Sequence, residues 1–91
     1  MGKMNHADRI KRLRFRSHHR GVREADMMVG GYFDVHHPSW TDAEMDWFEG
    51  FLEEQDVDIM GWAIGTLPVP ERWQGEMMRR LQALNYIEHP E

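Results

Sequence analysis

Residues 40–52 read WTDAEMDWFEGFL, and this stretch carries the clearest signal of local structure in the chain. Thr41 and Glu44 have the spacing of a capping box, in which each side chain accepts a hydrogen bond from the backbone N–H of the other residue. The flanking Trp and Met stand in the positions of a hydrophobic staple. Beyond them, aromatic and aliphatic residues recur at helical spacing. The stretch therefore predicts a helix with Thr41 as its N-cap that ends near Gln55.

Four other stretches space their apolar residues as a helix does, and none alternates apolar and polar residues over five positions as a strand would. Asn5 or Asp8 can cap the first helix, and Gly21 can end it because glycine adopts a left-handed conformation without steric cost. Asp56 can cap the fourth helix, and Pro70 suits the first turn of the fifth. We expect helices over residues 5–18, 22–36, 41–55, 56–64 and 70–86.

Two adjacent glycines, Gly30 and Gly31, lie inside the second predicted helix. Each costs about 1 kcal/mol relative to alanine in a helix interior. Either close packing of a neighbour compensates this cost or the helix bends there, and we expect a distorted helix. Five amphipathic helices with short connections predict an all-α, compact five-helix bundle. We expect a single domain over residues 1–91, with an ordered core at about residues 6–87.

The length and composition set limits on the class of protein. The chain has 91 residues and no Cys, which excludes disulfides and thiolate metal sites. No apolar run approaches the length of about 20 residues that a membrane-spanning helix needs, and the N-terminus lacks the apolar segment of a secretory signal. We therefore expect a protein that is not embedded in a membrane. A chain this short also leaves little room for a deep substrate cleft.

The charged residues are distributed unevenly along the chain. Residues 1–24 hold eight Lys and Arg against two acids, a net charge of +6, whereas residues 25–91 hold three against fourteen, a net charge of −11. We expect opposite ends of the domain to carry opposite potentials, which favours a charged protein partner. A nucleic-acid-binding module is a weaker alternative, because the acidic remainder would repel phosphate. It would use Lys11, Arg12, Arg14 and Arg16.

The residues that could carry chemistry do not combine into a recognisable site. The sequence has no glycine-rich phosphate loop, no HExxH and no Cys-based metal pattern. The His-His pairs at 18–19 and 36–37 supply few convergent ligands, because adjacent helical residues point about 100° apart. Met28, Met45 and Met77 lie on apolar stripes, which indicates core packing rather than a soft-metal site. We therefore expect no enzymatic activity and no metal.

One charged stretch, residues 16–26 with the sequence RSHHRGVREAD, lies between the first two predicted helices. Arg20 and Glu24 are four residues apart around Gly21. The spacing allows a local Arg–Glu pair that only fixes the turn, worth about 0.2–1 kcal/mol if exposed. It equally allows a rigid charged corner at which the small glycine lets another surface approach.

This stretch resembles the signature of a known family. Arg20-Gly-Val-Arg-Glu24 matches the RGxxE motif of the SdhE family of FAD assembly factors, the bacterial relatives of mitochondrial succinate dehydrogenase assembly factor two. Residues 56–62, DVDIMGW, are similar to the family's acidic segment before a buried Trp, and the resemblance spans about residues 6–85. The chain departs from the family at Ala25, where Leu is frequent, and at the Gly30-Gly31 pair.

The resemblance implies a five-helix bundle that is not an enzyme and that promotes covalent attachment of FAD to the flavoprotein subunit of succinate dehydrogenase and, in bacteria, of fumarate reductase. The FAD would belong to this partner, and a His of the partner would bond to the flavin. The N-terminus shows no long Arg- and Ser-rich presequence, so we expect a bacterial cytoplasmic protein. We also expect a monomer in the free state that binds no nucleic acid and holds no cofactor tightly. By matching positions, the partner-binding residues would be Arg20, Gly21 and Glu24, flanked by Arg16, Arg23 and Asp26.

A regulator of another protein, of the antitoxin type also proposed for members of this family, is the second alternative. The two ideas differ in the partner, since only the first requires a flavoprotein. We also expect Gly21→Arg to keep the fold and to abolish partner binding, on the ground that a corner tolerates bulk.

Overall fold

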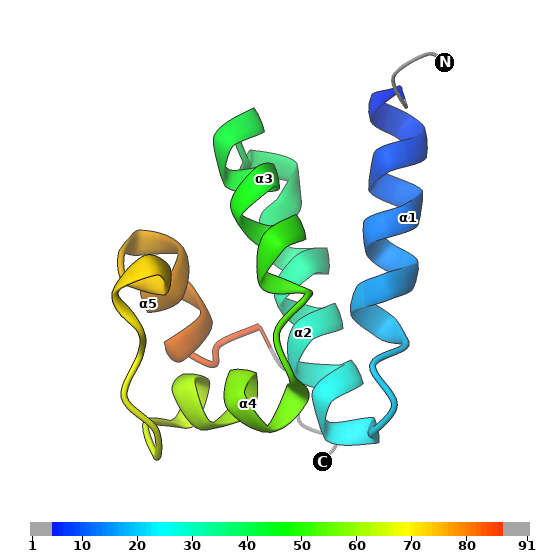
Figure 1. Cartoon of the computed structure of the whole chain (residues 1–91). Helices are drawn as coiled ribbons and strands as arrows, with labels where there is room; N and C mark the ends of the chain where they lie inside the picture. The colour runs from blue at the N-terminus through cyan, green and yellow to red at the C-terminus, as the bar shows by residue number, and fades with distance from the viewer. Residues whose placement is uncertain (1–4, 87–91) are drawn as a thin grey trace.

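The computed structural model describes residues 5–86, and this part of the chain forms five α-helices and contains no strand (Figure 1). The all-α five-helix class predicted from the sequence is confirmed. The predicted stop at His89-Pro90 and the outermost residue of the predicted core lie outside the described residues. The helices are α1 (His6–His18), α2 (Arg23–His36), α3 (Asp42–Phe51), α4 (Asp56–Ile64) and α5 (Glu76–Gln82), with 3-10 turns η1 (His37–Ser39) and η2 (Glu71–Trp73).

The helices α1, α2 and α3 lie side by side, and α4 runs across one end of this group (Figure 1). The short α5 packs on the side away from α1 (Figure 1). The connection from α1 to α2 and the connection from α3 to α4 therefore lie at the same end of the molecule.

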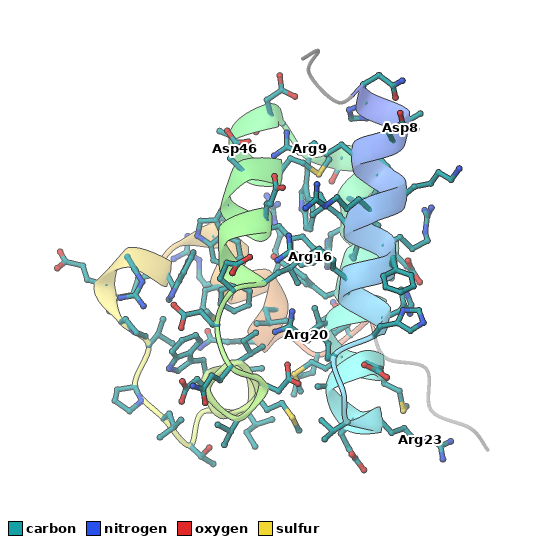
Figure 2. The ribbon with its side chains drawn as sticks, turned by 45° about the vertical axis from the view of Figure 1, so that its right-hand side comes forward. Asp8, Arg9, Arg16, Arg20, Arg23 and Asp46 are labelled. Carbon is teal, nitrogen blue, oxygen red and sulfur yellow. The ribbon has the colours of Figure 1, made fainter. Side chains whose placement is uncertain are left out.

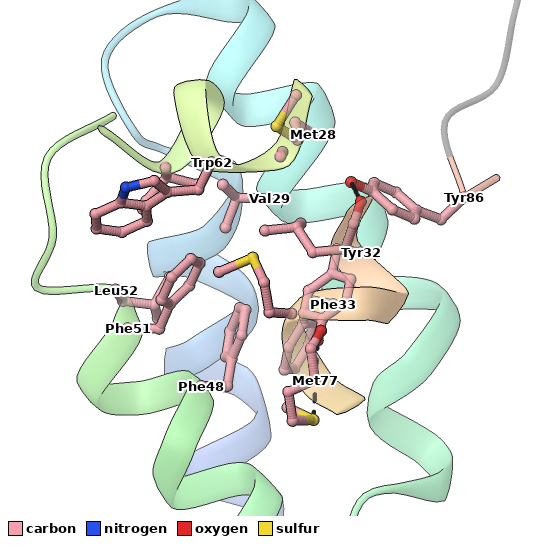
Figure 3. Close-up of a cluster of buried hydrophobic side chains, with 14 of the residues drawn as sticks. Met28, Val29, Tyr32, Phe33, Phe48, Phe51, Leu52, Trp62, Met77 and Tyr86 are labelled. Carbon is pink, nitrogen blue, oxygen red and sulfur yellow. Dashed lines mark hydrogen bonds between the residues drawn. The ribbon is translucent and has the colours of Figure 1, made fainter. Parts of the chain in front are cut away.

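The core lies between α2, α3, α4 and α5, with Leu13 added from α1, and is rich in aromatic side chains (Figure 3). Tyr32 and Phe33 of α2 are fully buried, and the Phe33 ring centroid lies 5.5 Å from that of Phe48 in α3. The Tyr32 hydroxyl donates a 2.7 Å hydrogen bond to the carbonyl of Met77, which ties α2 to α5. This hydrogen bond satisfies the Tyr32 hydroxyl, a polar group that would otherwise be costly to bury.

Two of the three caps predicted at the start of helices are present. The Asn5 side chain accepts a hydrogen bond from the Asp8 amide at 2.8 Å and caps α1. Thr41 and Glu44 form the capping box of α3, with the Thr41 amide 2.9 Å from the Glu44 carboxylate. This backbone hydrogen bond lowers the pKa of Glu44.

The fifth helix begins later than predicted. Pro70 has an extended backbone, and Gly75 has a φ of +136°, an angle that a helix cannot accommodate. Between them, the indole of Trp73 donates a 2.8 Å hydrogen bond to the Glu54 carboxylate and packs edge-on against Phe51. These contacts hold the segment against α3, so α5 starts only at Glu76 and ends at Gln82, short of the predicted end at residue 86.

The expected distortion of α2 at its glycine pair is wrong, because α2 is continuous from Arg23 to His36. A Cβ atom added to Gly30 would lie 2.5 Å from Nδ1 of His18, and one added to Gly31 would lie 3.2 Å from the Tyr86 carbonyl oxygen. The glycines therefore allow two other segments to approach the helix closely. Close packing, the other possibility that the sequence left open, compensates their cost.

Two predicted cap positions also differ in the structure. The helix α1 ends at His18 with His19 as its C-cap, so Gly21 lies in the connection and is not the residue that ends the helix. Gln55, not Asp56, is the N-cap residue of α4. The Asp56 carboxylate instead binds the side chain of Arg20.

Candidate partner-binding site

The connection between α1 and α2 is fixed by the side chain of Arg20, which points into the molecule (Figure 2). Its Nε donates to the Asp56 carboxylate, its Nη1 to the Leu52 carbonyl and its Nη2 to the Glu54 carbonyl, each at 2.8 Å. Only 10% of the side chain is exposed. A guanidinium presents its donors in a rigid planar fork, so three acceptors of this kind hold it in one orientation. The bend before α2 is therefore tied to the segment between α3 and α4.

Asp26 holds the same bend from the other side. Its carboxylate accepts a short hydrogen bond from the backbone amide of Arg20. Asp26 lies in the first turn of α2, where a negative charge is favoured by the helix dipole. The position of the Arg20 backbone is thus set by α2 and the position of its side chain by the α3–α4 connection.

Gly21 is exposed and has a φ of +113°, which side chains of L-residues rarely adopt. A Cβ atom added there would meet nothing within 4 Å. The backbone conformation therefore requires glycine, while the space above it is open. This corrects the expectation that Gly21→Arg leaves the fold untouched, since the corner has room for bulk but the backbone would be strained.

Arg23 and Glu24 follow in the first turn of α2, and both are exposed (Figure 2 labels Arg23). Within residues 5–86 neither side chain takes part in a hydrogen bond or an ion pair. The local pair of Arg20 with Glu24 considered from the sequence does not form, because Arg20 is bound to Asp56 instead. The exposed surface of the bend is formed by residues 21–24, which we call the corner.

Arginine side chains of the basic helix α1 reach acidic side chains of α3 and of the connection that follows it. Arg9 donates to Asp46 at 2.6 Å and to Glu49 at 2.8 Å, and Arg16 donates to Glu53 at 2.6 Å (Figure 2). The hydrogen bond with Asp46 raises the pKa of Arg9. The opposite charges at the two ends of the sequence thus lie side by side and partly cancel, contrary to the expected separation.

These ion pairs also bear on the nucleic-acid alternative. Of its four residues, Arg16 is paired with Glu53, and Arg14 lies 3.8 Å from Asp34. Two of the four basic side chains therefore already face a carboxylate, which leaves a weaker positive surface for phosphate.

The six partner-binding residues expected from the sequence fall into two groups. Arg16, Arg20 and Asp26 bind other parts of the chain, whereas Gly21, Arg23 and Glu24 form the exposed corner. The sequence did not reveal that Asp56 anchors Arg20, because 36 residues separate the two and no local spacing reports such a contact. The acidic segment that begins at Asp56 was the only available sign.

No group of three or more His, Cys, Asp or Glu side chains among residues 5–86 is placed to hold a metal ion. In the same residues no helix is long and apolar enough to cross a membrane.

The sequence of the chain is similar to proteins of one named family. A family model described as a flavinator of succinate dehydrogenase, Sdh5, matches residues 11–85. The chain is 38% identical over 77 residues to the FAD assembly factor SdhE of Acetobacter pasteurianus, an alignment that covers 85% of this chain and 71% of that protein.

Mitochondrial relatives of fungi match over a similar stretch. The identity is 39% over 75 residues to succinate dehydrogenase assembly factor 2 of Candida glabrata, covering 78% of this chain and 49% of the relative. For the protein of the same name in Meyerozyma guilliermondii it is 33% over 75 residues, covering 78% and 56%. The chain thus spans about half the length of these two relatives.

Proposed function

Since the chain belongs to the Sdh5 family of succinate dehydrogenase flavinators, we propose that it is an assembly factor that binds the flavoprotein subunit of succinate dehydrogenase and promotes covalent attachment of FAD to it. The observation that carries the proposal is the corner. Residues 21–24 are exposed, and the anchored Arg20 beside them holds their backbone in one conformation. A surface fixed in this way loses little conformational entropy when a partner binds.

Each residue of the corner has a distinct part in the proposal. Gly21 lets the partner's backbone come close, because no side chain stands in the open space above it. Arg23 and Glu24 offer one positive and one negative group to the partner, which favours one relative orientation over others. Arg20, Asp26 and Arg16 act as positioning residues that hold the corner in place.

The chain acts in this proposal by binding and not by catalysis. A binder stabilises whichever state of its partner it contacts better. If that state brings the partner's reactive side chain and the flavin into register, proximity alone supplies a large part of the rate gain. The FAD then belongs to the partner, and this chain is not an enzyme. In the proposal, the flavoprotein subunit of fumarate reductase is a second partner, to which FAD is attached covalently in the same way.

The remaining parts of the proposal concern the state and the place of action. We propose a monomer in the free state that acts in the bacterial cytoplasm and binds no nucleic acid. The similarity to a bacterial FAD assembly factor supports the place, and the pairing of Arg14 and Arg16 with acids supports the absence of nucleic-acid binding.

The test combines the purified flavoprotein subunit with FAD, in the presence and absence of this chain, and measures flavin fluorescence on a denaturing gel. We expect covalent flavin to rise with the unaltered chain and, with Arg23→Glu plus Glu24→Lys, to fall to the level measured without the chain. Arg12→Glu is the matched control, since Arg12 is an exposed charge on α1. It should behave as the unaltered chain does.

Two outcomes would contradict the proposal. If the chain with both substitutions raised covalent flavin as much as the unaltered chain does, the corner would not be part of the interface. A complex of the unaltered chain with a protein that carries no flavin, and none with the flavoprotein subunit, would favour a regulator of another protein.

A further inference from the structure

An apolar groove lies directly beside the corner. Its walls are Val22, the outer face of α4 and the loop that follows α4, and its volume is about 600 Å³. The apolar side chains that line it are Val22, Val57, Met60, Ile64 and Leu67.

More than half of the exposed large apolar side chains in the described residues line this groove. Seven large apolar residues within residues 5–86 are clearly exposed, and four of them, Val22, Val57, Ile64 and Leu67, line it. The exposed fractions are 67% for Val57 and 55% for Ile64. Single apolar residues on a surface are ordinary, but a contiguous group of them marks a site of interaction.

The groove is already formed in the free protein. The carbonyl of Gly61 accepts hydrogen bonds from the amides of Gly65, Thr66 and Leu67, at 3.0, 2.9 and 3.1 Å. The Leu67 side chain lies against Gly61, where an added Cβ atom would be 2.5 Å from it. The loop is therefore fixed on the end of α4, and a ligand would find the wall in place.

The position of the groove indicates what covers it. Val22 is part of the corner and part of the wall, and Asp56, which anchors Arg20, lines the groove as well. A partner seated on the corner therefore also meets the groove. No Lys or Arg lines the groove. Within the described residues, two carboxylates near the groove have no ion-pair partner: that of Glu24, in the corner, and that of Asp58, which follows the lining residue Val57 in the first turn of α4.

We propose that the groove receives an aliphatic segment of the flavoprotein subunit, flanked by Lys or Arg residues that face Glu24 and Asp58. This inference rests on the proposed function, because it names a second part of the same interface. The aliphatic side chains would bury Val57, Ile64 and Leu67, and the basic flank would match the two unpaired carboxylates beside the groove.

The test is the dissociation constant of the complex with the purified flavoprotein subunit, measured by titration calorimetry. Val57→Lys removes apolar contact and repels a basic flank, so we expect affinity to fall at least about tenfold, the effect of unburying one valine side chain. Val57→Asp should cost less, because its charge attracts the same flank. The matched control is Val35→Lys, at an exposed valine far along α2, which should stay within about twofold.

A second measurement needs no altered residue. In the complex, amide hydrogen exchange should slow over residues 57–67 relative to the free chain. The inference is overturned if Val57→Lys binds normally and these amides are not protected while the corner variant loses affinity. The groove would then not be part of the interface, and the proposed function would stand. If the unaltered chain does not bind the flavoprotein subunit, both ideas fail. If Val57→Lys turns a dimer of the free chain into a monomer, a second copy fills the groove and the inference is overturned.

Discussion

The Nε of Arg20 lies 2.8 Å from a carboxylate oxygen of Asp56, and this ion pair joins the bend before α2 to the first residue of α4. The exposed fractions of the two side chains are 10% and 21%. A pair with so little solvent around it is costly to break, because the remaining charge loses its partner without regaining full hydration. Two further hydrogen bonds, from Nη1 and Nη2 of Arg20 to backbone carbonyls, use the other nitrogens of the guanidinium. The arrangement therefore requires the planar, forked shape of this group.

Arg20→Lys should lower the free energy of unfolding by about 1.5–3 kcal/mol, since an ammonium group cannot reach all three acceptors. Urea unfolding followed by circular dichroism measures this. The control is Arg79→Lys, because Arg79 pairs with Glu76 on the exposed surface, where such a pair contributes about 1 kcal/mol or less. Equal losses from both substitutions would show that Arg20 is not the anchor of the bend.

Gly21→Ala and Gly50→Ala should change stability in opposite directions. At Gly21 the φ of +113° strains any L-residue, so we expect a loss of about 1–3 kcal/mol. At Gly50, inside α3, the added Cβ would lie 3.7 Å from Trp73, an ordinary contact, so we expect a gain of up to about 1 kcal/mol. Thermal unfolding of both variants tests the pair. A stabilising Gly21→Ala would mean that the bend adopts another backbone conformation.

Gly30→Ala should destabilise the protein although alanine favours helix. The added methyl group would lie 2.5 Å from the ring of His18, which is hydrogen-bonded to Asp34 at 3.0 Å and would have to move. In a His18→Ala background the clash is gone, so the same substitution should stabilise by about 1 kcal/mol. A double-mutant cycle of unfolding free energies measures the coupling. Additive effects would indicate that His18 does not pack on Gly30.

His36 should make stability depend on pH. Burial, aided by the positive charge of Arg80, lowers the pKa of His36 below 6.5 in the folded protein. The unfolded chain then binds the proton more readily, so the stability linked to His36 is complete above the unfolded pKa and is lost as the pH falls through the folded value. Its Nε2 atom is buried and has no hydrogen-bond partner within residues 5–86, and its ring packs against Tyr32 and Tyr86.

The measurement compares unfolding free energies of the unaltered chain and His36→Phe at about pH 7 and about pH 5. The unaltered chain should lose more stability between these two conditions than the variant does. Carboxylates such as Glu54, whose pKa is lowered by its hydrogen bond from Arg72, are present in both proteins and cancel in the comparison. If both proteins lost the same unfolding free energy between the two pH values, His36 would not be the source of the pH dependence.

Local sequence signals predicted the helices best where the structure is also local. The capping box of Thr41 and Glu44 needs only four consecutive residues, and it is present as predicted. The predicted start of the fifth helix is wrong because a contact between distant residues decides it. Pro70 was interpreted as its first residue, but the contact of Trp73 with Glu54, 19 residues away, decides the path of that segment.

The candidate site was predictable in its position and not in its construction. Gly21 and the charges around it pointed to a bend, which exists. The sequence could not distinguish an Arg20 that faces a partner from one that binds Asp56, because both use the same guanidinium. Likewise, the helical pattern of α4 gave no sign that Val57 and Ile64 remain exposed, since that depends on which elements fold against them.

The anchoring of Arg20 by Asp56, Leu52 and Glu54 means that residues 20–24 form a single unit with a segment some thirty residues downstream. A genetic screen for loss of covalent flavin attachment would then recover substitutions at Asp56 alongside substitutions in residues 20–24. Such alleles would act by releasing the corner. Compensating second-site substitutions should therefore arise around residues 20–26 and 52–56, two segments that are far apart in the sequence.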